Sequence, residues 1–157
     1  GASSMGALRA AELRGRGMRG IGVVYEAVVK GLITDDAELA VAMCPFTHRA
    51  LTASLVRVRC ALQIARQRGL GESDAVNAFE CARRIHFLER TTERLSRTWH
   101  QAVPDATEIV GSLASPESDV KAADAREAVR YALACVHLDG SGLPPSFTAL
   151  PSSQLWR

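Results

Sequence analysis

The chain has 157 residues, a formal net charge of +2, and 47% hydrophobic and 23% charged residues. These values are typical of a soluble globular chain that forms one domain, or most of one, with a real core. The small net charge gives little electrostatic drive toward nucleic acid. No apolar run reaches the roughly 18 residues that a bilayer span requires, so we expect a cytoplasmic protein without a membrane span.

Two helices are expected within the first thirty residues. Ser3 or Ser4 can cap a helix from Met5 to about Leu13, and the glycines of GRGMRGIG interrupt the helical pattern after it. A second apolar-periodic helix follows from about Ile21 to Val29, and Gly31 provides its C-terminal cap.

The stretch TDDAELAVAMC allows two interpretations. Asp35 and Glu38 fit a capping box for a short helix, whereas ELAVAMC fits a buried strand. The best helix of the chain is expected from about Thr47 to Gln67, where apolar residues recur at spacings of three and four and Gly69 stops the pattern.

Further helices follow. GESDA opens one with acidic residues, Pro104 interrupts the series, and a final helix runs from about Glu117 to Ala134. We expect four apolar side chains of this last helix to be buried: Val120, Ala123, Val129 and Leu133. Residues 139–157 have loop composition and are predicted to form a flexible tail. The predicted fold is therefore mainly α, with one or two short strands.

Metal chemistry finds little support in the sequence. The cysteines are widely spaced, with no CxxC pair and no histidine at ligand spacing, at Cys44, Cys60, Cys81 and Cys135. This spacing argues against zinc and predicts reduced, mostly buried thiols. The adjacent acids Asp35 and Asp36 can hold a metal ion, but acids at a helix start more often cap it. We expect no metal and no cofactor.

The opening stretch GASSMGALRAAEL carries the candidate chemistry. Small residues around Ser3 and Ser4 allow a sharp turn, and a serine at a helix start lies beside unpaired backbone N–H groups and the positive end of the helix dipole. This arrangement suits a nucleophile in a strand–turn–helix elbow, and it suits an ordinary helix cap equally well. Spacing alone leaves both interpretations open.

GASSMGALRAAEL together with GMRGIGVVYEAVVKGLITDDAELAV resembles the core domain of the TfuA family. The resemblance continues more weakly through SLVRVRCALQIARQRGL and IHFLERTTERL. It makes residues 1–100 a TfuA-like core, with residues 101–138 an additional helical region. It also implies that this sequence is the C-terminal portion of an α/β domain whose first strand–helix–strand segment precedes it.

TfuA proteins are partners of YcaO enzymes in making peptide backbone thioamides. The resemblance implies hydrolysis of a thiocarboxylated carrier protein of the ThiS type, which supplies sulfide to a YcaO enzyme acting on a precursor peptide. The family's site is similar to that of a Ser–Lys hydrolase, which places the nucleophile on Ser4, with Ser3 second. The partner lysine is expected in the preceding segment, and Lys30 is the early lysine within this sequence.

Two other functions compete with this one. One is a non-catalytic adaptor that binds both a YcaO enzyme and its peptide or carrier. In this function Arg9 and Arg19 would contact an acidic tail of the partner. An arginine-rich helical nucleic-acid binder is the least favoured, because the net charge is low. The candidate substrate- and partner-binding residues are Gly6, Arg9, Glu12, Arg19, Asp35 and Asp36.

Overall fold

The computed structural model describes residues 1–137, and the predicted tail over 139–157 lies outside the described residues. Contacts divide the described chain into two units. We call residues 35–119 the central unit, and residues 1–34 together with 120–137 the discontinuous unit. The boundary that the family resemblance places near residue 100 falls within a helix of the central unit.

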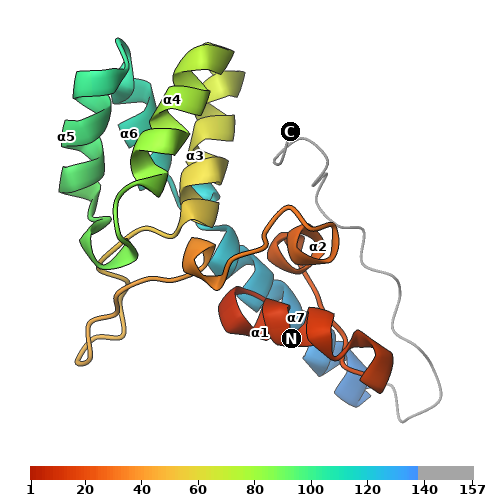
Figure 1. Cartoon of the computed structure of the whole chain (residues 1–157). Coiled ribbons are helices and arrows are strands. Elements are labelled where there is room, and N and C mark those ends of the chain that lie inside the picture. Colours follow the sequence, from red (N-terminus) through yellow and green to blue (C-terminus); the bar gives the residue numbers. More distant parts are fainter. Residues whose placement is uncertain (138–157) are drawn as a thin grey trace. The chain divides into compact units, whose positions relative to one another are not determined.

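The central unit is a bundle of four helices: α3 (Leu55–Gln67), α4 (Glu72–Arg83), α5 (Thr92–Ala102) and α6 (Ala106–Ala114). Helix α3 packs on α4 and α6, and α5 packs on the same two helices, so the four stand side by side (Figure 1). Three single 3₁₀ turns connect them to the rest of the unit: η2 (Asp36–Glu38), η3 (Phe87–Glu89) and η4 (Pro116–Ser118).

Trp99 lies at the centre of the bundle core. Its side chain is fully buried, and its indole N–H donates to the Ala78 carbonyl at 2.9 Å. Short hydroxyl side chains cap two of the helices: Ser54 Oγ accepts from Arg57 N–H, and Thr91 Oγ1 accepts from Arg94 N–H.

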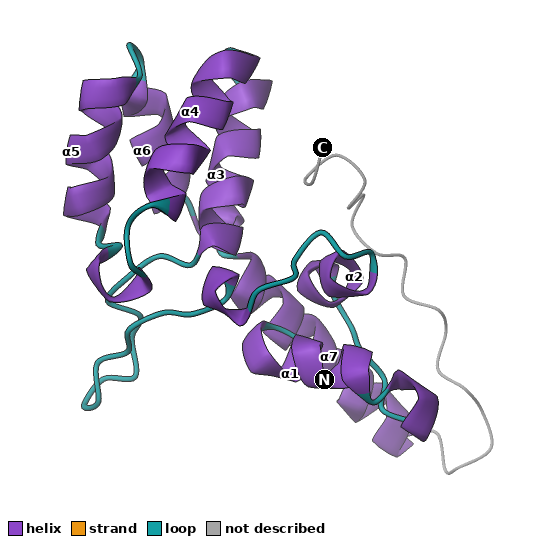
Figure 2. Ribbon diagram, in the orientation of Figure 1, coloured by secondary structure: helices purple, strands orange, loops and turns teal. Residues whose placement is uncertain are grey.

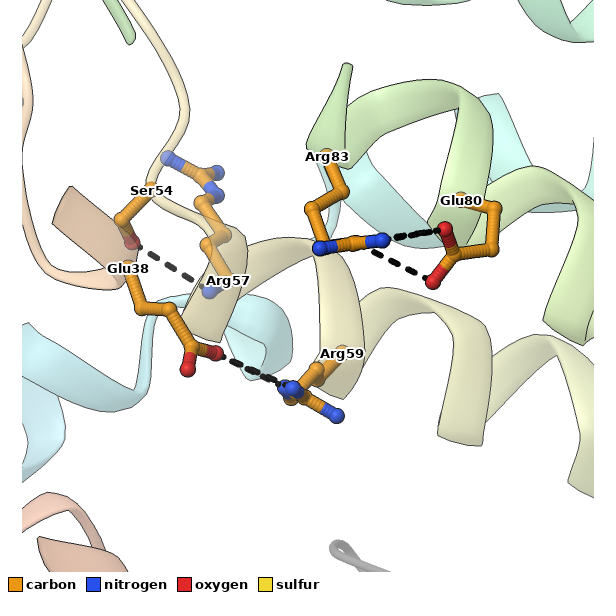
Figure 3. Close-up of polar contacts among 6 residues, drawn as sticks. All are labelled: Glu38, Ser54, Arg57, Arg59, Glu80 and Arg83. Carbon is orange, nitrogen blue, oxygen red and sulfur yellow. Dashed lines mark hydrogen bonds and ion pairs between the residues drawn. The ribbon is translucent and has the colours of Figure 1, made fainter. Parts of the chain in front are cut away.

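Arginine side chains join the outer elements of the central unit (Figure 3). Arg59 pairs with Glu38 at 3.0 Å, and its guanidinium also lies 4.0 Å from the centre of the Phe79 ring. These two contacts tie η2 and α4 to α3. Arg83 pairs with Glu80 at 2.8 Å along α4, where the pair is largely exposed.

Two local predictions for the central unit are resolved by the structure. The short helix forms at Asp36–Glu38, in place of a strand over ELAVAMC. The helix expected from Thr47 begins instead at Leu55, so that prediction was wrong at its start. The preceding residues pair across a loop, with Cys44 N–H donating to the Arg49 carbonyl and Leu51 N–H to the Ala42 carbonyl. Because the Leu51 N–H binds the Ala42 carbonyl, it cannot bind the Thr47 carbonyl, as a helix that begins at Thr47 would require.

The discontinuous unit contains α1 (Ser4–Glu12), the 3₁₀ turn η1 (Arg14–Arg16), α2 (Val23–Val29) and α7 (Val120–His137). Helix α2 packs on both α1 and α7. The buried interior of the discontinuous unit consists of small and β-branched side chains, including Ala7, Ala10, Val23, Val24 and Ala27. Helices α1 and α2 form where the periodicity predicts them.

The expected burial of α7 was wrong at two positions. Val129 is 59% exposed and Leu133 is 56% exposed, and the buried residues of this helix are Val120 and Asp124. Helix α7 has 18 residues but α2 has only seven. At 1.5 Å per residue, α7 is therefore about 17 Å longer than the helix that packs on it.

The described chain is mainly helical, as predicted from the sequence. Figure 2 shows helices and loops, and extended pairing within residues 1–137 is limited to two isolated bridges, Ala2 with Ile21 (parallel) and Met43 with Ala50 (antiparallel). Among these residues, no helix combines the length and hydrophobicity needed to cross a membrane.

Candidate active site at the start of the first helix

The two serines of the opening stretch lie in a strained turn between an extended residue and a helix. Ala2 forms a parallel bridge with Ile21, and α1 begins two residues later at Ser4. Ser3 has φ 55° and ψ 153°, and Ser4 has φ 35°. Positive φ values at non-glycine residues cost on the order of 1–3 kcal/mol each. The order of an extended residue, a turn and a helix resembles a nucleophile elbow, although Ala2 forms an isolated bridge and not a strand.

Ser3 occupies the N-cap position of α1 without acting as a side-chain cap. Its carbonyl accepts from Ala7 N–H at 3.0 Å, but its hydroxyl makes no capping hydrogen bond. Both Ser3 and Ser4 are half-buried. Within residues 1–137, the N–H groups of Met5 and Gly6 also donate to no acceptor. The positive end of α1 is therefore open beside the serines, as an oxyanion would require.

The neighbouring helix α2 begins with the same order of elements but has an internal anion. Ile21 is in the bridge, Gly22 has φ 98°, and α2 starts at Val23. The carboxylate of Asp124, from α7, accepts from Val23 N–H at 2.9 Å and from Val24 N–H at 2.8 Å. This carboxylate satisfies two N–H groups that no residue of α2 can satisfy.

Asp124 is only 2% exposed, and its burial raises the pKa of the carboxyl from 3.8 to about 6. The two backbone N–H donors act in the opposite direction, because they favour the charged form. Glu127 and Glu26 raise the pKa slightly further by repulsion. A substantial part of the Asp124 population is therefore protonated just below neutral pH.

Residues 1–91 match the family described as TfuA-like protein. The match covers more than half of the 157 residues. This chain belongs to the TfuA-like family. The family predicted from the opening residues is thus confirmed, and the matched region includes the serine turn and helices α1 to α4. A comparison with curated proteins finds no match.

Lys30 of this TfuA-like chain lies at the C-terminal end of α2, whereas the serine turn is next to the bridge that precedes α2. Its ammonium group pairs with Glu26 at 3.4 Å and is exposed. A helix of seven residues is about 10 Å long, so α2 separates Lys30 from the bridge by roughly that distance along its axis.

The predicted binding residues of the discontinuous unit lie along α1 and in the loop before α2. Gly6 is in the first turn of α1, and Arg9 pairs with Glu12 at 2.6 Å on its exposed side. Arg19 donates to the Tyr131 hydroxyl at 2.6 Å, which links the loop to α7. Arg9 and Glu12 thus satisfy each other at the surface, while Arg19 has a structural partner.

Asp35 and Asp36 belong to the central unit. Asp35 caps η2, accepting from Ala37 N–H at 2.8 Å. Within the described chain, no group of three or more histidine, cysteine, aspartate or glutamate side chains is placed to hold a metal ion. The cysteines are free thiols, but the prediction that they are mostly buried was wrong: Cys60 is buried, Cys44 and Cys81 are half-buried, and Cys135 is exposed.

Sequence reasoning did not identify Asp124 as part of this site. It lies outside the residues that match the family, and its partners Val23 and Val24 are about 100 residues away in the chain. One signal was present: Asp124 follows Val120 by four residues, and therefore shares its buried face of α7. A lone carboxylate on a buried face requires hydrogen-bond donors.

Proposed function

We propose that this chain supplies sulfide for peptide backbone thioamidation, by hydrolysing a thiocarboxylated carrier protein of the ThiS type for a YcaO enzyme that modifies a precursor peptide. Membership of the TfuA-like family gives the context. The observation that supports the hydrolytic step is the strained Ser3–Ser4 turn at the open N-terminus of α1. We place the protein in the cytoplasm, where free thiols persist.

The proposed chemistry is acyl transfer without a redox step. Ser4 Oγ attacks the carbonyl carbon of the carrier's thiocarboxylate while a neutral amine takes the hydroxyl proton. The C–S bond breaks as the protonated amine returns this proton to the sulfur, so that hydrosulfide leaves and the carrier's acyl group forms an ester with Ser4. Water then hydrolyses this ester to a carboxylate and the free serine. The N–H groups of Met5 and Gly6 are the candidate donors to the oxyanion of each step.

Sulfide release from a thiocarboxylated ThiS-type carrier tests this proposal. We would assay the chain, and the product of its whole reading frame, as the wild type and as Ser4→Ala, Ser3→Ala and Ser73→Ala. Ser73 is an exposed serine near the start of α4 and serves as the matched control. We expect Ser4→Ala to lower release at least a hundredfold and Ser73→Ala to leave it unchanged. Equal release from wild type and Ser4→Ala would overturn the catalytic assignment.

The same assay decides the role of Lys30. Loss of release in Lys30→Gln, with an unchanged circular dichroism spectrum, would assign Lys30 as the base, and wild-type release would exclude it. The adaptor function makes a different prediction: no variant releases sulfide, yet the chain increases the affinity of the YcaO enzyme for its peptide.

A further inference from the structure

Helix α7 holds the loop before α2 at two points. The Asp124 carboxylate binds the N–H groups of Val23 and Val24, and the Tyr131 hydroxyl accepts from Arg19. Helix α7 follows the region that matches the TfuA-like family, so the match assigns no role to either side chain. Both contacts join segments more than 95 residues apart in the chain.

A short path of backbone contacts runs from Asp124 to the serine turn. Gly22 lies directly on the carboxyl group, since a Cβ at this position would come within 2.2 Å of Asp124 Cγ. Ile21, the next residue back, donates its N–H to the Gly1 carbonyl at 2.9 Å and forms the parallel bridge with Ala2. Ser3 follows Ala2 directly, so the position of Ile21 constrains the strained turn.

Ser3 and Ser4 need such a constraint because their conformation is intrinsically unfavourable. A turn with two consecutive positive φ values at serine persists only where surrounding contacts enforce it. The bridge to Ile21 is the pairing that fixes the residues before the turn. Whatever holds Ile21 in place therefore also holds the turn.

We propose that Asp124 is a positioning residue for the Ser3–Ser4 turn, acting through the start of α2 and the bridge between Ile21 and Ala2. In this arrangement the region beyond the family match supplies the carboxyl group that fixes the candidate nucleophile. The catalytic consequence rests on the proposed function, whereas the mechanical coupling does not.

The coupling between protonation of Asp124 and opening of the Ile21 N–H can be tested on the wild-type protein by changing the pH. The charged groups that act on Asp124 are Glu127 of α7 and Glu26 of α2, both acidic. If opening of the Ile21 N–H also releases Asp124 into water, the pKa of the carboxyl falls on opening from about 6 to 3.8. Protonation then favours the closed state, and the protection of Ile21 against hydrogen exchange increases about tenfold from pH 7 to pH 5.

The experiment is amide hydrogen exchange by NMR at pH 5, 6 and 7 on the wild type, Asp124→Asn and Thr91→Ala. Thr91→Ala removes the cap of α5 and controls for general loosening. We expect the Ile21 protection factor to titrate near pH 6 in the wild type and in Thr91→Ala. In Asp124→Asn it should be at least tenfold lower at pH 5 and independent of pH. Ile21 protection in Asp124→Asn that equals the wild-type protection at every pH would overturn the proposal.

Sulfide release provides the second measurement and separates the two proposals. Asp124→Asn should lower kcat at least tenfold with little change in the KM for the carrier, since Asp124 touches the start of α2 and not the carrier. Unchanged kcat would overturn positioning of the nucleophile. If the wild type releases no sulfide, the proposed function fails, and the comparison of Ile21 protection between the wild type and Asp124→Asn still decides the coupling.

Discussion

The central and discontinuous units satisfy helix N-termini in opposite ways. In the central unit the caps are local: Ser54 and Thr91 each accept from a backbone N–H three residues later. In the discontinuous unit α2 is capped by Asp124, a buried carboxylate about 100 residues away, and α1 follows two serines with positive φ. A local serine or threonine cap costs little free energy. The distant Asp124 cap requires desolvation of a carboxyl group, and the serine turn requires a strained backbone.

The two units also differ in their buried residues, and therefore in the contributions to their free energies of folding. The central unit has the large apolar core, with Trp99, Leu95 and Ile109 fully buried. The discontinuous unit buries mainly alanine and valine, yet it contains the two consecutive serines with positive φ and the buried acid, whereas the central unit contains His48 with φ 54° and the buried Arg90. Departures from the easiest local solution are expected at functional sites, so the comparison supports the choice of Ser3 and Ser4.

The largest effect is expected in the core of the central unit. Trp99→Ala should lower the free energy of unfolding by about 3–5 kcal/mol, because it leaves a cavity and removes the bond to Ala78. Urea denaturation followed by circular dichroism measures this. The control is Leu88→Ala, a side chain that is 56% exposed and should cost below about 0.5 kcal/mol. Similar losses in both variants would contradict this description of the core.

Gly22→Ala tests the contact on which the discontinuous unit depends. The added methyl would collide with the Asp124 carboxyl at a residue with φ 98°, and we expect a loss of about 3 kcal/mol or more. Gly31→Ala is the matched control, because Gly31 has φ 68° but no atom within 4 Å of an added Cβ. It should cost only about 1 kcal/mol. Equal melting temperatures would show that Gly22 does not lie against Asp124.

The next effect concerns pH. The folded-state pKa of Asp124 is raised from 3.8 to about 6, so its contribution to stability is fully present below pH 3.8 and is lost as the pH rises through about 6. The wild type should lose on the order of 3 kcal/mol relative to Asp124→Asn across this window. Denaturant titrations of both proteins at pH 4, 5, 6 and 7 measure the difference. A constant difference would show that Asp124 is not buried as described.

A substitution that relieves the backbone strain at Ser3 should change the free energy of unfolding by a smaller amount, and in the stabilising direction. Ser3→Gly should raise the free energy of unfolding by about 1 kcal/mol, because glycine adopts φ 55° and ψ 153° without a Cβ clash. Ser96→Gly, within α5, should instead lower it by about 0.5–1 kcal/mol. Thermal unfolding of both variants tests the two signs, and destabilisation by Ser3→Gly would mean that the turn is unstrained.

The smallest effect is expected at the surface of α1. Arg9→Ala removes an exposed pair with Glu12 and should change stability by less than about 0.5 kcal/mol. If Arg9 contacts an acidic partner, the same variant weakens binding to the YcaO enzyme in isothermal titration calorimetry. Unchanged binding removes Arg9 from the partner surface.

The sequence predicts those parts of the structure that depend on neighbouring residues. The periodicity and the glycines place α1 and α2 to within about two residues, because helix ends respond to local caps. The start of α3 was missed because residues 42–51 pair across a loop. The small residues predicted a sharp turn at Ser3 and Ser4, but not its pairing with Ile21 nor the capping of α2 by Asp124 from α7. Such distant contacts leave no periodic pattern in the sequence.

The origin of the Asp124 cap has a consequence for the order in which a ribosome produces the parts of this protein. Residues 35–119 emerge together and have their packing partners as soon as they are synthesised. The start of α2 is made earlier but lacks its carboxylate until Asp124 emerges. A chain that terminates before residue 120 therefore has all of the central unit, while the start of its α2 lacks the contact with Asp124. Synthesis of α7 becomes the step that secures the candidate nucleophile.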